Sequence, residues 1–161
     1  MNKLKRFLTN SFHLNDLNNF INETLLPFIN ERYNVTLENL SVAGASCGGA
    51  AALYVGLKNN EKYDNIYAFT SATGILSKRC LNQVFAKLVK GKTSLPNICL
   101  FQGLNDDLER LLYSGNKYIK ELLIKNGYDE TKLYEYIESS ANHNEDAWRY
   151  AFNYYFYLLN K

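Results

Sequence analysis

Segments of two kinds alternate along this chain of 161 residues. Short runs of apolar and β-branched residues alternate with longer segments whose apolar residues recur every three or four positions. The strand-like runs are residues 41–46, 65–72, 97–104 and 132–139. Because strands that alternate with helices form strand-helix-strand units, the pattern predicts a mostly parallel sheet with helices on both faces. The expected fold class is therefore α/β, built as a three-layer sandwich.

The helix-like segments surround these runs. Helical spacing predicts helices over residues 16–29, 47–58, 81–88 and 114–126, and from Glu145 onward. In the first of these, Pro27 is expected to interrupt or kink the helix. Its apolar positions fall on one face, which is expected to be buried: Leu17, Phe20, Ile21, Leu25, Phe28 and Ile29. Residues 74–95 are expected to cover the sheet, with a role as a pocket rim as the alternative.

Length, composition and charge narrow the class of protein. A chain of 161 residues suits a single domain over residues 1–161, and 47% hydrophobic and 14% aromatic residues exclude a disordered chain. A net charge of +2 with scattered lysines makes a nucleic-acid partner unexpected. The basic start, residues 1–13, lacks an apolar run, so we expect an N-terminal arm rather than a signal peptide or a membrane span.

Three cysteines without paired spacing favour reduced thiols and a cytoplasmic location. Cys47 is expected to pack at the start of a helix, and Cys80 and Cys99 are expected to be buried. The two histidines lie far apart in the sequence, and no pair of cysteines has the spacing of a zinc site. Neither a metal nor another cofactor is therefore expected.

The sequence Gly44-Ala45-Ser46-Cys47-Gly48 lies where the first predicted strand passes into a helix. In this position G-x-S-x-G is typical of a nucleophile elbow, a tight turn that lifts the serine clear of the sheet. Gly44 and Gly48 are expected to remove Cβ atoms that would clash in the turn. The backbone N–H of Cys47 is expected to face a developing oxyanion. A glycine-rich turn without chemistry and a phosphate-binding loop remain alternatives, although the spacing matches neither phosphate motif.

A serine nucleophile requires a base and an orienting acid. His143 follows the last predicted strand in a polar loop, where the carboxyl ends of parallel strands gather active-site groups, whereas His13 precedes every strand. Asp106, which follows the third strand, is favoured over Asp107 as the acid. The order Ser46, Asp106, His143 matches the known hydrolases with such an elbow. The alternative for Asp106 is an Asx turn or a helix N-cap.

Together these segments resemble the esterases of the α/β-hydrolase fold that include esterase D and the enterochelin-esterase-like proteins. The resemblance runs through LLPFINERYNV, SVAGASCGGAAALYVGLKN, EKYDNIYAFTSA, GLNDD, NKYIKELLIKNGYDE and YIESSANHNEDAWRYAF. It implies an α/β-hydrolase-like domain that cleaves small-molecule carboxylic esters through an acyl-enzyme on Ser46. It also implies that His143 is the general base and acid, and that Asp106 is the orienting acid.

The chain departs from that family on its N-terminal side. Family members carry further strands before the helix of residues 16–33, and a loop after one of them supplies a second oxyanion donor. The sheet is therefore expected to be truncated, and strand 41–46 to have an unpaired edge that invites a second copy or a complementing chain. Losing one oxyanion donor costs about 3–4 kcal/mol of transition-state stabilisation. Two alternatives to an active esterase therefore remain: an impaired homologue that acts as a binding module, and one half of a split enzyme.

Overall fold

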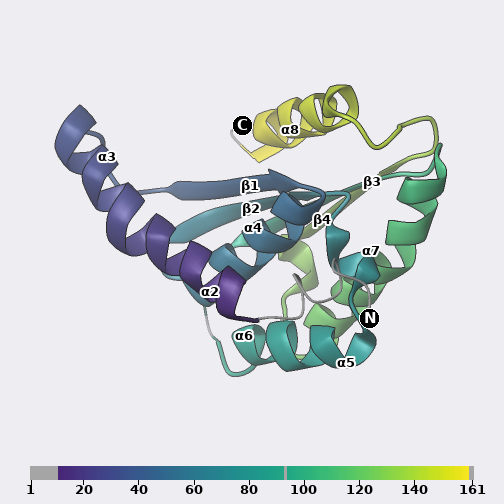
Figure 1. The fold of residues 1–161 in the computed structure, drawn as a ribbon, viewed down its shortest axis with the longest axis horizontal. Coiled ribbons are helices and arrows are strands. Elements are labelled where there is room, and N and C mark those ends of the chain that lie inside the picture. The colour runs from purple at the N-terminus through teal and green to yellow at the C-terminus, as the bar shows by residue number, and fades with distance from the viewer. Residues whose placement is uncertain (1–10, 93, 160–161) are drawn as a thin grey trace.

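The computed structural model describes residues 11–92 and 94–159. Within these residues, four strands form one sheet in the order β1-β2-β3-β4 (Figure 1). The strands are β1 (Leu40–Ala45), β2 (Tyr63–Phe69), β3 (Asn97–Gly103) and β4 (Leu133–Glu138). Each strand pairs in parallel with the next one along the chain. The predicted α/β class and parallel sheet are therefore confirmed.

Helices cover both faces of this sheet (Figure 1). One face carries α4 (Cys47–Lys58), α5 (Lys78–Leu81), η3 (Asn82–Ala86), α6 (Lys87–Val89) and α7 (Asp107–Lys125). The other face carries α8 (Glu145–Leu159). Two short 3-10 turns complete these connections, η2 (Ala72–Ile75) after β2 and η4 (Glu130–Lys132) before β4. The three-layer arrangement expected from the sequence is present.

Alternate residues of the two central strands face two separate cores. The core toward α4 and α7 contains Ile66, Ala68, Ile98 and Leu100. The core toward α8 contains Tyr67, Phe69, Cys99 and Phe101. This alternation follows from strand geometry, because successive side chains point to opposite faces of a sheet. The segment over residues 78–89 buries Leu81, Phe85 and Val89 in the first core, so its predicted covering role is confirmed.

The N-terminal helical segment does not bury the face that its sequence predicts. It consists of α2 (Ser11–Asn19), the π-helical stretch η1 (Phe20–Leu25) and α3 (Leu26–Tyr33). Neither η1 nor α3 contains a buried residue, and Phe28 is 56% exposed. The prediction of one buried face is therefore wrong. The segment contacts the helical layer near α2, where the Asn59 amide donates to Asn18. The last part, α3, extends away from the sheet, so it has no layer against which to bury its apolar side chains (Figure 1).

Pro27 lies at the start of α3, directly after the π-helical stretch. Proline cannot donate a backbone hydrogen bond, so a local widening of the helix before it is a common adjustment. The helix therefore continues through Pro27 with altered winding, in place of the predicted interruption. Most of the N-terminal arm predicted over residues 1–13 lies outside the described residues.

Two further features of the fold bear on the sequence predictions. β1 forms one edge of the sheet, because among the described residues only β2 pairs with it. The predicted open edge is therefore present. In the described ranges, no helix combines the length and the apolar character that crossing a bilayer requires.

Candidate active site

Ser46 connects β1 to α4 in a strained backbone conformation. Its φ of 53° and ψ of −120° lie in a region where residues other than glycine are rarely found. Holding a serine in this conformation costs roughly 1–3 kcal/mol. Its N–H donates to the carbonyl of Phe69 at 2.9 Å. Its own carbonyl accepts from the N–H groups of Gly49 at 3.1 Å and Ala72 at 2.8 Å. A serine held this way between strand and helix has the backbone expected of a nucleophile elbow.

The two glycines that flank this turn differ in their surroundings. A Cβ on Gly44 would lie 2.1 Å from the carbonyl oxygen of Gly48, so the turn leaves no room for a side chain there. A Cβ on Gly48 would meet nothing within 4 Å. A clash was expected at both positions, and the structure shows one at Gly44 but not at Gly48. The next glycine, Gly49, lets α4 lie close to the sheet, because a Cβ there would lie 3.1 Å from the carbonyl oxygen of Phe69.

Cys47 is the first residue of α4. The first N–H groups of an α-helix have no acceptor within the helix, and the helix dipole favours negative charge there. Its thiol is exposed, which corrects the expectation that it packs. Cys80 is partly exposed, whereas Cys99 is buried, and burial raises the pKa of the Cys99 thiol to about 12.

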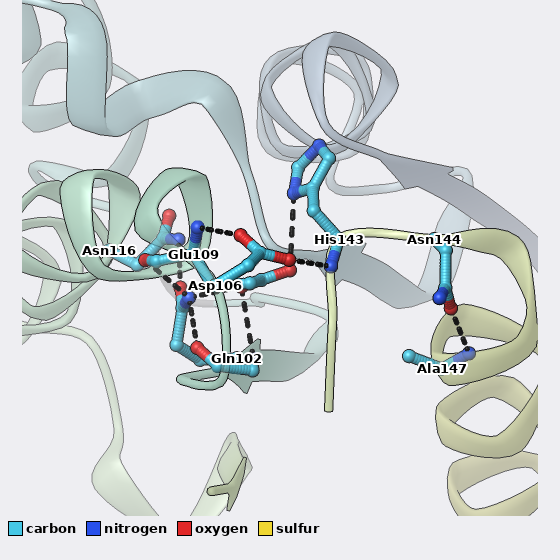
Figure 2. Close-up of polar contacts among 8 residues, drawn as sticks. Gln102, Asp106, Glu109, Asn116, His143, Asn144 and Ala147 are labelled. Carbon is cyan, nitrogen blue, oxygen red and sulfur yellow. Dashed lines mark hydrogen bonds and ion pairs between the residues drawn. The ribbon is translucent and has the colours of Figure 1, made fainter. Parts of the chain in front are cut away.

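His143 lies in the loop between β4 and α8, with its ring against the buried carboxylate of Glu109 (Figure 2). The Nδ1 atom of the ring is 3.1 Å from Oε1 of Glu109. The side chain of His143 is 12% exposed, and that of Glu109 is fully buried. Trp148 packs perpendicular to the imidazole, with ring centroids 5.0 Å apart. A carboxylate at Nδ1 fixes the ring orientation and leaves Nε2 free to exchange a proton.

Asp106, which the sequence predicted to orient the ring, binds backbone groups instead. Its Oδ1 accepts the N–H of Glu109 at 2.8 Å and thereby forms the N-cap of α7. Its Oδ2 accepts the backbone N–H of His143 at 2.6 Å. These two bonds, the one from Glu109 first, hold the pKa of Asp106 below its ordinary value. The alternative interpretation of Asp106, a helix N-cap, is confirmed for its Oδ1 atom. The contact with the imidazole ring, which the sequence assigned to Asp106, is made by Glu109.

Sequence reasoning missed Glu109 because it sought the acid in the loop after β3. Glu109 lies in the first turn of α7, which begins seven positions earlier than its apolar pattern indicated. The available signal was the spacing between Asp106 and Glu109. An N-cap residue followed three positions later by glutamate is a common start of a helix. Here that glutamate side chain points toward His143.

The second oxygen of the Glu109 carboxylate is bound inside the protein. Oε2 accepts the side-chain amide of Gln102 and, at 3.1 Å, the backbone N–H of Gly103. The Gln102 oxygen accepts from Asn116 at 2.6 Å, and the Asn116 oxygen accepts from the Thr73 hydroxyl at 2.7 Å. Burial raises the pKa of Glu109, while hydrogen bonds and the neighbouring imidazole oppose that rise.

The structure thus joins His143, Asp106 and Glu109 into one contact group. Ser46 and His143 follow β1 and β4 at the carboxyl ends of parallel strands. In the part of the chain that the structure describes, their side chains form no hydrogen bond with each other. The described residues also contain no cluster of three or more histidine, cysteine, aspartate or glutamate side chains that could hold a metal ion.

Comparison with known proteins gives the family. A family model described as "Putative esterase" matches residues 6–156, which is nearly the whole chain. The chain belongs to this esterase family. A comparison with curated proteins finds no match.

Solved structures of esterases share the fold. Siderophore hydrolase EstA from Aspergillus nidulans superposes with a TM-score of 0.68 at 18% identity, over 91% of this chain and 56% of that one. Enterochelin esterase from Shigella flexneri gives 0.67 at 18% identity, over 83% and 34%. S-formylglutathione hydrolase from Agrobacterium tumefaciens gives 0.63 at 18% identity, over 88% and 55%. The α/β-hydrolase fold is therefore shown, and this chain spans between a third and just over half the length of these proteins.

A cavity of about 340 Å³ lies beside the His143 loop of this member of the esterase family. Both sequence neighbours of His143 line it, together with residues from β3, β4 and α8: Phe101, Glu138, Ser140, Ala141, Asn142, Asn144, Ala147 and Tyr150. Its volume falls in the range of small-molecule pockets. The esterase fold thus places a cavity next to the loop that carries the histidine.

Proposed function

We propose that the chain hydrolyses carboxylic esters through an acyl-enzyme on Ser46, with His143 as general base and acid and Glu109 orienting its ring. The observation that carries the proposal is the 3.1 Å contact between Nδ1 of His143 and the buried Glu109 carboxylate. Membership of the esterase family and the strained backbone of Ser46 support it. A serine at its ordinary pKa is a weak nucleophile, so it requires such a base.

The proposed reaction follows from the roles of these groups. Nε2 of His143 takes the hydroxyl proton of Ser46 while its oxygen attacks the ester carbonyl, and the Glu109 carboxylate stabilises the imidazolium. The N–H of Cys47 donates to the oxyanion of the tetrahedral intermediate. As the intermediate collapses, the alcohol leaves with the proton from Nε2. Water then attacks the acyl-enzyme by the same steps, which releases the carboxylic acid and restores Ser46.

Small esters are the proposed substrates. The names of the similar structures include ferulic acid esterase and enterochelin esterase, which supports testing small acyl esters first. The cavity beside the His143 loop, which is lined by both sequence neighbours of His143 but not by His143 or Ser46, has the volume for a compact substrate group. The open edge of β1 supports a second copy or a complementing chain as a partner, and the three free cysteines support a cytoplasmic location.

Hydrolysis of p-nitrophenyl acetate tests the proposal. The chain has two histidines, so His13→Ala is a matched control for His143→Ala. We expect His143→Ala and Ser46→Ala each to lower kcat/KM by about a thousandfold or more, and His13→Ala to leave it unchanged. Mass spectrometry of the quenched reaction is expected to find one acetyl group on Ser46. A Ser46→Ala variant that retains the wild-type rate would overturn the assignment.

The same assay separates the two alternatives. A folded wild-type chain that neither turns over the ester nor becomes acetylated would favour a binding module. Activity that appears only after adding a polypeptide with the upstream strands of a family member would identify one half of a split enzyme. An active wild-type chain on its own contradicts both.

A further inference from the structure

A buried series of hydrogen bonds leads from Glu109 into the helical layer, away from the reacting groups. We propose that Gln102 and Asn116 are positioning residues that keep the Glu109 carboxylate ionised and directed toward His143. The inference rests on the proposed function, because it assigns these amides a role through Glu109 and His143. It adds residues that neither the motif nor the ring contact identifies.

The hydrogen bonds of this series all run in one direction. The Thr73 hydroxyl donates to Asn116, Asn116 donates to Gln102, and Gln102 donates to Glu109. An amide accepts only at its oxygen and donates only from its nitrogen, so the bond that each amide accepts fixes the direction in which its nitrogen donates. All three donors therefore point toward Glu109. Figure 2 shows the last links, with Asn116 and Gln102 on one side of the carboxylate and His143 on the other.

All residues of this series are buried. The most exposed of them is Asn116, at 8%. A buried carboxylate is penalised in its charged form, and burial raises the pKa of Glu109. The Gln102 amide and the Gly103 N–H both donate to Oε2 and stabilise the ionised form. These protein donors replace the water that the carboxylate has lost.

The two oxygens of the Glu109 carboxylate have different partners. Oε2 is occupied by Gln102 and Gly103, so Oε1 is the oxygen that meets Nδ1 of His143. The Gln102 nitrogen also donates to the backbone carbonyls of Gly103 at 2.7 Å and Glu109 at 3.0 Å. This places the amide between β3 and the start of α7. The hydrogen bonds from Gln102 and Gly103 therefore fix the plane of the Glu109 carboxylate, and through it the orientation of the His143 ring.

The backbone brings the far end of the series close to the elbow. A Cβ on Gly115 would lie 2.0 Å from Cα of Gly74, so α7 and η2 touch at their backbones next to Asn116 and Thr73. In the same turn, the N–H of Ala72 donates to the carbonyl of Ser46 at 2.8 Å. One short segment therefore contacts both the serine turn and the series of amides.

The test measures the titration of His143 together with kinetics. In a His13→Gln background, His143 is the one histidine in the chain, so its imidazole resonances can be followed by ¹H–¹⁵N NMR. Gln102→Leu removes the donor to Oε2 and favours neutral Glu109. We expect the titration midpoint of His143 to fall by about one pH unit and kcat to fall about thirtyfold, with KM within roughly threefold. Asn116→Ala is expected to shift both in the same direction by less.

Asn153→Ala, on the exposed surface of α8, is the matched control and is expected to change neither quantity. If Gln102→Leu does not fold, Thr73→Val, which retains the side-chain shape, carries the same test. Folded variants with the wild-type His143 midpoint and kcat would overturn the inference and leave the amides a structural role. A shifted midpoint in a chain without esterase activity would instead overturn the proposed function and leave the inference standing.

Discussion

The two sides of the candidate site are held by different parts of the protein. Ser46 is fixed by backbone: its N–H and carbonyl are both bonded to main-chain groups, and Gly44 leaves no room for a side chain. His143 is fixed largely by side chains, with Glu109 at its ring and Asp106 at its N–H. Substitutions that change backbone space should therefore act on the serine side, and substitutions that change hydrogen-bonding groups should act on the histidine side.

The largest expected effect comes from the two carboxylates on the histidine side. Glu109→Gln should lower kcat about a thousandfold, because the new amide would donate to Nδ1 and leave the ring proton on Nε2. Asp106→Asn should lower kcat less than about tenfold, since Asp106 contacts backbone groups. Steady-state ester hydrolysis measures both. Equal losses would mean that the ring contact does not decide which carboxylate orients the histidine.

A glycine pair tests the serine side. Gly44→Ala should destabilise the fold by about 3 kcal/mol, because its Cβ would collide with the backbone of Gly48. Gly48→Ala should be neutral or stabilising by up to about 1 kcal/mol, because its Cβ meets open space inside a helix. Urea unfolding monitored by circular dichroism gives both values. Similar losses for the two variants would show that the turn does not depend on space at Gly44.

Asp106 links stability to pH on the histidine side. Its pKa in the folded chain is lowered, so it stabilises the fold above its unfolded-state pKa of about 3.9, and this stabilisation is lost as pH falls through the lower folded value. Asp106→Asn should cost about 1–2 kcal/mol at pH 7, because one acceptor becomes a donor that faces an N–H group. The difference from wild type should shrink as pH falls below the unfolded-state pKa and vanish once pH lies below the lower folded-state pKa. A loss that is constant with pH would contradict the ionic role.

The smallest expected effect lies outside both sides of the site, in the N-terminal helix. Phe28→Ala should change the free energy of unfolding by less than about 0.5 kcal/mol, because 56% of this side chain is exposed and α3 buries none of its residues. Urea unfolding of wild type and variant measures the change. A loss of about 3 kcal/mol, typical of a buried phenylalanine, would show that something covers this face in solution.

Sequence patterns predicted what depends on local periodicity and chain order. The four strands follow from short apolar and β-branched runs, α4 follows from the helix formers behind the glycines after Ser46, and the candidate histidine follows from its place after the last strand. Periodicity shows that one face of a helix is apolar but not what covers it, so the exposed face around Phe28 was predicted incorrectly. It also cannot show which of several nearby carboxylates turns inward.

The start of α7 illustrates that second difficulty. Leu108 and Leu111 are both exposed, and the buried stripe of this helix begins with the charged Glu109, so its first turn does not show the apolar pattern of its later part. The helix begins there because Asp106 caps it, and the cap brings Glu109 round to face the ring. A tertiary contact with His143, 34 positions along the chain, then selects Glu109.

The strained backbone at Ser46 lowers the stability of the fold at the position that the proposed reaction requires to be a serine. Its cost of roughly 1–3 kcal/mol is a substantial share of the roughly 5–15 kcal/mol that holds an ordinary domain folded. Glycine would adopt the same conformation without that cost. A lineage of this fold released from selection for catalysis would therefore gain stability by exchanging the serine for glycine. Among related sequences, the residue at this position should separate chains that still require the hydroxyl from those that have drifted toward a more stable fold.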